Sequence, residues 1–299
     1  MIKTLVVFFG FFMLATTVPA QTTTPPLKRA GPDNSGSLTR SGVPLNVMTF
    51  NIRYGKAKDG PDAWPLRKTR TFRILQKYKP DVVGMQEALW GQIQDIKKAM
   101  PSYGVVGVGR EDGRIRGEFA PIMYNTGRLQ LLRSDTFWMS ETPDVPDTTS
   151  WGNYIVRICT WAYFYDLRSR RCFYQFNTHL DHISQLSREK SAAMILDRIK
   201  KVAPKDPVLV TGDFNSGEQN PAIDEMRKGG FRDTFRVLYP DLKIEGTTTA
   251  FKPRRQRDKI DYVFVDGAWN VEAAAIPDDK YDGRWPSDHL PVTAEVVLK

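Results

Sequence analysis

Short apolar runs alternate with longer amphipathic segments along this 299-residue chain. The apolar runs predict β-strands at residues 45–50, 82–83, 103–108, 121–124, 129–132, 155–165, 172–177, 208–210, 260–265 and 292–298. Helical periodicity and capping residues predict helices at residues 64–78, 92–100 and 184–202. A further helix is expected to open at Asn220-Pro221 and to close at Gly229-Gly230. This alternation of strands and helices is typical of an α/β protein.

Two of the predicted helices carry an apolar side that is expected to face the core. In the first helix, the inward positions are expected to be Leu66, Phe72, Leu75 and Tyr78. In the helix at 184–202, which Ser184 can cap, they are expected to be Leu186, Ala193, Leu196 and Ile199.

Polar side chains gather where the predicted strands end or begin. Four groups follow a strand and two precede one, in the order Asn51; Glu87; Asn177, His179 and Asp181; Asp213 and Asn215; Asp261; Asp288 and His289. If all six groups meet on one rim, some strands must run opposite to others. This arrangement favours mixed or antiparallel sheets with helices outside over an all-parallel, doubly wound sheet.

The stretch Gly212-Asp213-Phe214-Asn215 is central to this pattern. It follows a buried strand, and Gly212 permits a sharp turn. Asp213 and Asn215 are two residues apart, so an extended backbone presents both side chains on one face. The same composition is common in ordinary turns, and the functional interpretation therefore depends on the other five groups.

All three histidines of the chain, at 179, 182 and 289, lie within these groups. This concentration favours a chemical role for His179 and His289. His182 has an equally simple structural explanation, because it could cap the helix that follows.

The side chains present limit the chemistry. Glu87, Asp288 and Asn51 are hard oxygen ligands, suited to Mg²⁺, Mn²⁺ or Ca²⁺. The sequence contains no zinc-type cysteine or histidine cluster, no nucleophile elbow and no P-loop. Of the reactions considered, metal-assisted attack of water on a phosphorus ester is the one that these residues still allow. One histidine would take a proton from the water, and Asp261 could orient His289.

The chain has 43 Lys and Arg against 34 Asp and Glu, a net charge of +9. This excess is consistent with an anionic partner such as nucleic acid, phospholipid or a phosphate ester, although many secreted proteins are basic. Part of the positive charge is concentrated in two loops. The first contains Arg110, Arg114 and Arg116, and the second contains Lys252, Arg254, Arg255 and Arg257. These loops could capture phosphate or be solvated surface. Trp285, three residues before Asp288, could line the site or belong to the core.

The N-terminus is predicted to be a secretory signal peptide, residues 1–20, with Lys3, an apolar run and small residues before the cleavage point after Ala20. Residues 21–43 are rich in Thr, Pro, Ser and Gly and are expected to be a flexible segment. Residues 44–299 are expected to form one domain. We therefore predict a secreted or periplasmic protein with no integral membrane segment after the signal is removed.

Two cysteines in a secreted chain suggest a disulfide. The predicted hairpin argues against one, because its turn near Arg168-Ser169 places Cys159 opposite Thr178 and Cys172 opposite Tyr165. The thiols are then out of register and too far apart to be bridged. We predict two free cysteines.

Six motifs in order resemble the endonuclease/exonuclease/phosphatase superfamily, which has the DNase I-like fold. They are Thr49-Phe50-Asn51, Gln86-Glu87, Asn177-Thr178-His179-Leu180-Asp181-His182, Gly212-Asp213-Phe214-Asn215, Lys259-Ile260-Asp261-Tyr262 and Ser287-Asp288-His289-Leu290-Pro291-Val292. The resemblance implies a four-layer α/β sandwich, with two mixed β-sheets packed face to face and helices outside. It also implies a phosphoesterase that uses Mg²⁺ or Mn²⁺.

The resemblance assigns roles by position. Asn51 and Glu87 correspond to metal-site residues, with Asp288 near the metal. His179 corresponds to an acid or phosphate-binding histidine. Asp213 and Asn215 correspond to the pair that orients water and phosphate, and Asp261 and His289 to an Asp–His dyad. Whether Asp213 or His289 is the base stays open. Asn177, Arg110 and Trp285 are the expected substrate-binding residues.

Within the superfamily, three further stretches resemble a largely bacterial secreted subgroup. They are Gly109-Arg110-Glu111-Asp112-Gly113, Phe137-Trp138-Met139-Ser140-Glu141-Thr142-Pro143 and Thr160-Trp161-Ala162. The expected substrate is a phosphodiester, as for a nuclease, with nucleic acid as the candidate partner. A phosphomonoester, a lipid headgroup or another small phosphoester is the alternative. A non-catalytic binding module would have lost metal or histidine positions, and none is missing. The oligomeric state is not indicated.

Overall fold

The computed structural model describes residues 42–252 and 258–299. The predicted signal peptide, most of the segment at 21–43, and Arg254, Arg255 and Arg257 of the second basic loop lie outside the described residues. Among the helices of the described part, none has the length and apolar composition needed to cross a membrane.

Two six-stranded mixed sheets pack face to face. The first contains, in spatial order, β11 (Trp269–Ala275), β12 (Val292–Leu298), β1 (Leu45–Asn51), β2 (Val82–Gln86), β4 (Ile122–Asn125) and β3 (Tyr103–Val106). The second contains β5 (Leu129–Trp138), β6 (Ile158–Asp166), β7 (Arg171–His179), β8 (Val208–Asp213), β10 (Asp261–Val265) and β9 (Arg232–Asp233). The pairs β1–β2 and β7–β8 are parallel, and the other pairings are antiparallel.

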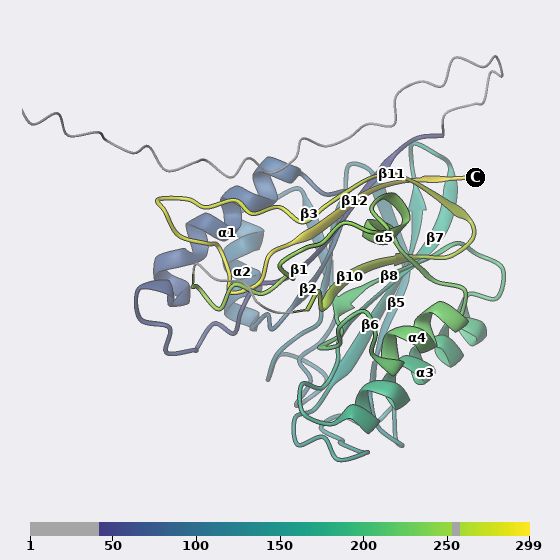
Figure 1. The fold of residues 1–299 in the computed structure, drawn as a ribbon, viewed down its shortest axis with the longest axis horizontal. Helices are drawn as coiled ribbons and strands as arrows, with labels where there is room; N and C mark the ends of the chain where they lie inside the picture. Colours follow the sequence, from purple (N-terminus) through teal and green to yellow (C-terminus); the bar gives the residue numbers. More distant parts are fainter. Residues whose placement is uncertain (1–41, 253–257) are drawn as a thin grey trace, which may run out of the picture.

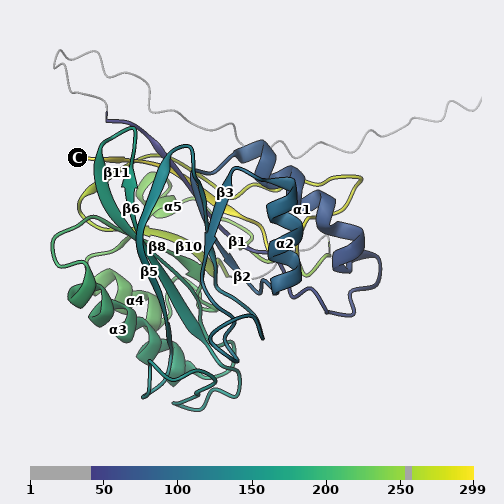
Figure 2. The same cartoon turned by 180° about the vertical axis from the view of Figure 1, so that it is seen from behind.

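Helices cover the outer faces of the two sheets (Figures 1 and 2). Helices α1 (Trp64–Tyr78) and α2 (Trp90–Ala99) pack on the first sheet through a core that includes Phe50, Ile74 and Ile93. Helices α3 (Gln185–Val202) and α4 (Pro221–Lys228) pack on the second through a core that includes Phe176 and Ile195. The short elements η1 (Gly60–Asp62) and α5 (Thr234–Leu238) complete the chain. The predicted four-layer α/β sandwich is confirmed.

The predicted caps of α3 and α4 are confirmed, because Ser184 accepts a hydrogen bond from the Ser187 amide and Asn220 accepts one from Ala222. The predicted faces were partly wrong. Leu66 is 64% exposed and Leu186 is 52% exposed. Polar side chains take inward positions in both helices, including Arg67 and Thr71 in α1 and Ser187 and Ser191 in α3. Apolar periodicity alone therefore placed the buried stripe incorrectly.

The predicted hairpin register is confirmed, with Cys159 opposite Thr178 and Cys172 opposite Tyr165. Both thiols are free. The edge strands were predicted poorly. Strand β5 extends to Trp138 rather than residue 132, and β11 was missed. Few of their side chains are buried, so the alternation that indicates a strand is weak in both.

The two thiols should differ sharply in reactivity. Cys159 is fully buried and burial raises the pKa of its thiol, whereas Cys172 is partly exposed. A thiol reagent should modify one cysteine rapidly in the native protein and both after unfolding in guanidinium. Cys172→Ser should abolish the rapid phase. A rapid phase that persists in Cys172→Ser would contradict the burial of Cys159.

The layer between the sheets changes from apolar to polar along its length. At one end, the inward residues include Val47, Val82, Leu209 and Val263. Toward the carboxyl ends of β1, β2, β7 and β8, they become Thr49, Gln86, Gln175, Asn177 and Thr211, all of which are buried. Asn177 joins the sheets, because its Nδ2 donates to the Met85 and Pro121 carbonyl oxygens at 2.7 and 3.0 Å. Gln86 Nε2 and Thr211 Oγ1 donate to its Oδ1 at 2.8 and 3.1 Å.

Gly84 is required where this polar layer is narrowest. A Cβ atom there would lie 2.2 Å from Thr211 Oγ1 and 2.3 Å from Asn177 Oδ1. Gly84→Ala is expected to destabilise the fold by about 3 kcal/mol, because the sheets must separate or the hydrogen bonds must break. For a domain of this size, Tm should fall by roughly 10 °C.

Gly267→Ala is the control for this substitution. Apart from its two chain neighbours, no described residue has a heavy atom within 4 Å of the Cβ that alanine would add at 267. Calorimetry should therefore show little change in Tm for this variant. An equal loss of Tm in both variants would mean that the close approach at Gly84 is not the cause.

Candidate active site

The predicted polar groups meet at one edge of the sandwich. Asn51, His179 and Asp213 are the last residues of β1, β7 and β8, and Glu87 follows β2. Asp261 begins β10 and is paired with Asp213 in the sheet. Asp288 and His289 lie just before β12. The prediction that four groups follow strands and two precede them is confirmed. Because β8–β10 and β1–β12 are antiparallel, the groups at strand ends and those at strand starts lie on the same edge.

His289 and Asp261 form a close pair. His289 Nδ1 lies 3.0 Å from Asp261 Oδ2 and 3.8 Å from Asp213 Oδ2. Burial lowers the pKa of His289, but the carboxylates of Asp261 and Asp213 outweigh it and raise the pKa well above the usual value. Asp261 is buried, and its Oδ1 has no hydrogen-bond partner within the described residues. The geometry places the imidazole beside two carboxyl groups, and its raised pKa favours the protonated form.

Asp213 occupies the centre of the cluster. Its Oδ2 accepts a hydrogen bond from Asn51 Nδ2 at 3.0 Å, and its Oδ1 accepts one from the Asn215 amide at 2.9 Å. Burial and the neighbouring Asp261 charge raise the pKa of Asp213 to about 7. His179 Nε2 is 3.6 Å from Asp213 Oδ2. Burial, with the charges of Arg157 and Arg110, lowers the pKa of His179 well below its usual value. The opposite pKa shifts favour a neutral His179 and a cationic His289 on either side of the Asp213 carboxyl group.

Three site residues have left-handed backbone conformations that non-glycine residues rarely adopt. The φ angles are 62° at Arg53, 60° at Glu87 and 47° at Asn215. Such conformations cost on the order of 1 kcal/mol each and cluster at functional sites. At Asn215, the turn brings its amide to Asp213 and its Nδ2 to the Leu180 carbonyl oxygen at 2.9 Å.

Oxygen ligands for a cation lie beside this cluster. Glu87 Oε1 accepts a hydrogen bond from Asn51 Nδ2 at 3.0 Å, and Glu87 Oε2 accepts one from the Tyr54 amide at 2.7 Å. Burial raises the pKa of Asp288, and the Glu87 charge adds to the effect. Arg53 Nη1 is 3.5 Å from Asp288 Oδ2. Two neighbouring carboxyl groups, next to a buried amide, fit a hard divalent cation.

Another set of potential ligands is formed by Asp213, Asp261 and His289, whose ligand-type atoms lie within 4.8 Å of one another. In this set, His289 Nδ1 and Asp261 Oδ2 already bind each other at 3.0 Å, so neither atom is available to a cation. We therefore assign these three residues to proton handling and place the cation at Asn51, Glu87 and Asp288.

Residues 48–289 match the model of the Endonuclease/Exonuclease/phosphatase family. The chain belongs to this family. An endonuclease/exonuclease/phosphatase family protein of known structure from Bacteroides thetaiotaomicron is 31% identical, with a TM-score of 0.81, over 86% of this chain and 99% of the other. A mannosyl-6-phosphatase from the same organism is 32% identical, with a TM-score of 0.80, over 85% of this chain and 100% of the other.

A curated relative, tyrosyl-DNA phosphodiesterase 2 of Danio rerio, is 26% identical over 82% of this chain and 64% of its own length. The chain thus spans just under two thirds of that protein. Members of the endonuclease/exonuclease/phosphatase family are phosphoric ester hydrolases that use divalent metals, and this chain is such a hydrolase.

The structure does not bring two of the expected substrate-binding residues to an accessible position in the site. Asn177 is fully buried between the sheets, and its amide atoms are engaged by the protein as described above. Trp285 is 5% exposed, with its Nε1 donating to Asp278 Oδ1 at 2.7 Å and Lys280 Nζ lying 3.9 Å from the ring centroid. The structure thus places both side chains in the protein core, and their substrate-binding role stays a prediction.

Arg110 lies near His179 but is engaged by another residue. Its guanidinium forms two hydrogen bonds of 3.0 Å with Glu118. Arg116 contacts Asp112 at 3.4 Å, and Arg114 is exposed. The first basic loop therefore does not present its three arginines together toward the cluster.

Arg157 was missed by the sequence reasoning. It is buried beside His179 with Arg110, its Nη2 lies 3.0 Å from His182 Nδ1, and its Nε lies 3.6 Å from Asp181 Oδ2. His182 thus contacts Arg157 rather than capping α3, whose cap is Ser184. The available signal was a single charged residue inside the apolar run Ile155-Val156-Arg157-Ile158-Cys159.

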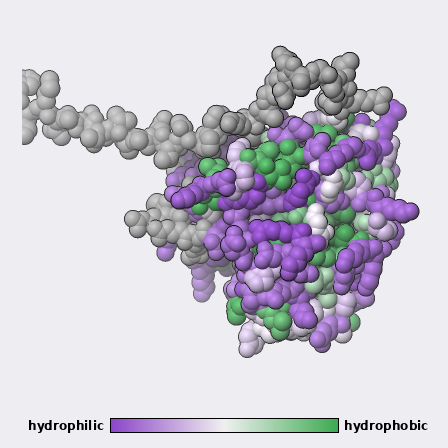
Figure 3. Space-filling view, turned by 45° about the vertical axis from the view of Figure 1, so that its right-hand side comes forward, coloured by the Kyte–Doolittle hydropathy of each residue, from purple (hydrophilic) through white to green (hydrophobic). Residues whose placement is uncertain are grey.

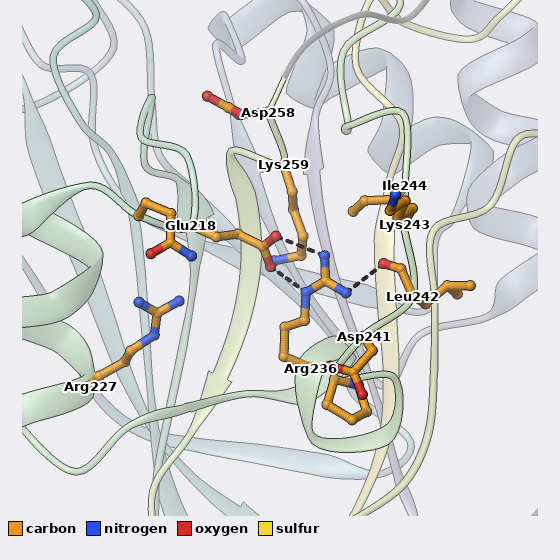
Figure 4. Close-up of a pocket in the computed structure, with 11 residues that line it drawn as sticks. Glu218, Arg227, Arg236, Asp241, Leu242, Lys243, Ile244, Asp258 and Lys259 are labelled. Carbon is orange, nitrogen blue, oxygen red and sulfur yellow. Dashed lines mark hydrogen bonds and ion pairs between the residues drawn. The ribbon is translucent and has the colours of Figure 1, made fainter.

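A cavity of about 640 Å³ near α4 and α5 is separate from this chemistry. Figure 4 shows Arg236 held by Glu218 and by the Leu242 carbonyl oxygen. Lys259 Nζ is 2.8 Å from Asp233 Oδ2. Arg236 and Lys259 already have carboxylate partners, so neither offers a free charge to a phosphate.

Proposed function

We propose that this enzyme hydrolyses small phosphomonoesters with Mg²⁺ or Mn²⁺. The pairing of His289 with Asp261 next to Glu87 and Asp288 is the observation that carries phosphoester hydrolysis. The mannosyl-6-phosphatase supports a monoester, because it is 32% identical and is covered along its whole length.

Asn51, Glu87 and Asp288 would hold the cation, which neutralises phosphate oxygens when bound. The protein's own groups handle the protons. The raised pKa of His289 favours the imidazolium, which donates a hydrogen bond to an anionic phosphate oxygen. Asp213, whose pKa lies near neutrality, is suited to accept the proton of the attacking water. Asn215 and neutral His179 orient the water and the phosphate.

A phosphodiester, the substrate expected from the sequence, is the second candidate. The net charge of +9 and the similarity to a tyrosyl-DNA phosphodiesterase support it. The test is a panel of hexose 6-phosphates, glycerol 3-phosphate, bis-p-nitrophenyl phosphate, plasmid DNA and RNA, each with Mg²⁺ and with Mn²⁺. Faster turnover of monoesters supports the first candidate, and faster cleavage of bis-p-nitrophenyl phosphate or nucleic acid replaces it by the second.

We also propose that the protein is exported. The apolar N-terminal run followed by Val18-Pro19-Ala20 supports a cleaved signal peptide. Mass spectrometry of the protein expressed in a Gram-negative host should find it in the periplasm or medium, beginning at Gln21. An uncleaved chain in the cytoplasm would contradict this proposal.

A further inference from the structure

A second cavity, of about 660 Å³, opens beside the candidate cation site. Its walls come from residues 54–56, from residues 89–92 at the start of α2, and from Glu111 and residues 115–117. The Tyr54 amide donates to Glu87 Oε2 at 2.7 Å, so one wall begins directly at that carboxylate. A phosphate held at the cation site would therefore have its carrier group within reach of this cavity.

Trp90 gives the cavity a rigid aromatic wall. The residue is 41% exposed, although tryptophan usually buries most of its surface. Its ring stacks on buried Phe119 with a centroid distance of 6.0 Å and an interplanar angle of 24°. The backbone supports this stack, because the Phe119 amide donates to the Ala88 carbonyl oxygen at 2.8 Å. Ile115, which is 56% exposed, adds apolar surface to the same cavity.

The charges around Trp90 are balanced. Asp95 and Glu111 provide carboxylates, and Lys56 and Arg116 provide cations. Two neighbours outside the lining keep the balance, because Lys68 lies 3.3 Å from Asp95 and Asp112 lies 3.4 Å from Arg116. A polyanionic strand would meet both carboxylates without an excess of positive charge to offset them. Carboxylates accept hydrogen bonds from hydroxyl groups, and the cations can donate to them. This lining therefore suits a neutral ligand with many hydroxyl groups.

We infer that this cavity binds the carrier group of the phosphoester and that the carrier is an uncharged, polyhydroxylated ring, a sugar, with one C–H face on Trp90. This inference rests on the proposed function and names the substrate class of that site. A saturated ring packs on the indole by dispersion and by removal of apolar surface from water. Its hydroxyl groups then face the polar side chains of the rim.

The test compares Trp90→Ala with the wild-type enzyme on hexose 6-phosphates and on glycerol 3-phosphate, which lacks a ring. The kcat/KM for the best hexose phosphate should fall by about 10-fold to 100-fold, since an aromatic contact contributes on the order of 1–3 kcal/mol. The value for glycerol 3-phosphate should change less than about 3-fold. Trp90→Phe should recover most of the loss, and Leu66→Ala, an exposed apolar residue outside the cavity, should behave as wild type.

A binding measurement separates this inference from the proposed function. Saturation-transfer NMR with methyl glycosides of mannose, glucose and galactose, without added metal, should detect binding to the wild-type protein and to His289→Ala. Trp90→Ala should lose the signal. If the wild type hydrolyses no phosphoester, the proposed function fails, and a Trp90-dependent glycoside signal still supports the cavity.

Three results would overturn the sugar assignment. The first is an equal loss of kcat/KM for glycerol 3-phosphate and hexose phosphates in Trp90→Ala. The second is absence of Trp90-dependent glycoside binding. The third is a Trp90-dependent preference for thymidine 5′-monophosphate over every hexose phosphate, which would make the occupant a nucleobase.

Discussion

His289→Ala is expected to lower kcat by about 10²-fold to 10⁴-fold, the range for a lost proton-handling group. The imidazole lies 3.0 Å from Asp261 and 3.8 Å from Asp213, so its removal leaves two buried carboxylates without their shared cation. The transition state also loses a charged hydrogen-bond donor. Steady-state kinetics on the best substrate of the panel would measure the effect.

His182→Ala is the matched control for this variant. His182 is exposed and contacts Arg157 rather than the carboxylates of the cluster. Its loss should change kcat by less than about 10-fold, because it positions a neighbour and does not handle the proton. Equal activity of His289→Ala and the wild type would remove His289 from the mechanism, provided that both proteins show the same Tm.

Removal of divalent metal by EDTA is expected to abolish hydrolysis, and added Mg²⁺ or Mn²⁺ should restore it. Glu87→Gln should lower kcat by about 10²-fold to 10⁴-fold, because a bound cation contributes several kcal/mol to charge stabilisation. The substitution keeps the size of the side chain and its acceptor oxygen for the Tyr54 amide, but it removes the negative charge. Calorimetric titration with Mn²⁺ should show correspondingly weaker binding.

Glu272→Gln is the control for charge loss elsewhere. Glu272 is exposed on the edge strand β11, so its neutralisation should leave both Mn²⁺ affinity and kcat unchanged. Full activity of the wild type in EDTA, or unchanged Mn²⁺ binding in Glu87→Gln, would contradict the assigned cation site.

The face drawn in Figure 3 carries no single broad apolar surface. On the face in Figure 3, hydrophilic residues predominate and hydrophobic residues reach the surface in separate patches. Trp90 is informative because its exposed indole lines the cavity that begins at Tyr54, whose amide donates to Glu87.

The sequence by itself determined the local features of this site. Strand ends are marked by apolar runs that stop at polar residues, and the positions of Asn51, His179 and Asp213 follow from this pattern. Caps such as Ser184 depend on neighbours within three residues, and the hairpin register follows from one turn. The order of six motifs then predicted the family and the opposite strand directions.

The tertiary structure alone decided which polar side chains face the reaction. Asn177 and His179 lie on the same face of β7. Asn177 hydrogen-bonds to the other sheet in the interior, whereas His179, at the end of the strand, belongs to the site. Trp285 is covered by Lys280, and Arg157 meets His179 and His182 after the sheets pack. These contacts join residues that are distant in the sequence. The sequence pattern cannot predict them, because hydrophobic periodicity indicates only which face of a helix or strand a residue lies on. Where two elements place their side chains together depends on packing across the whole sandwich.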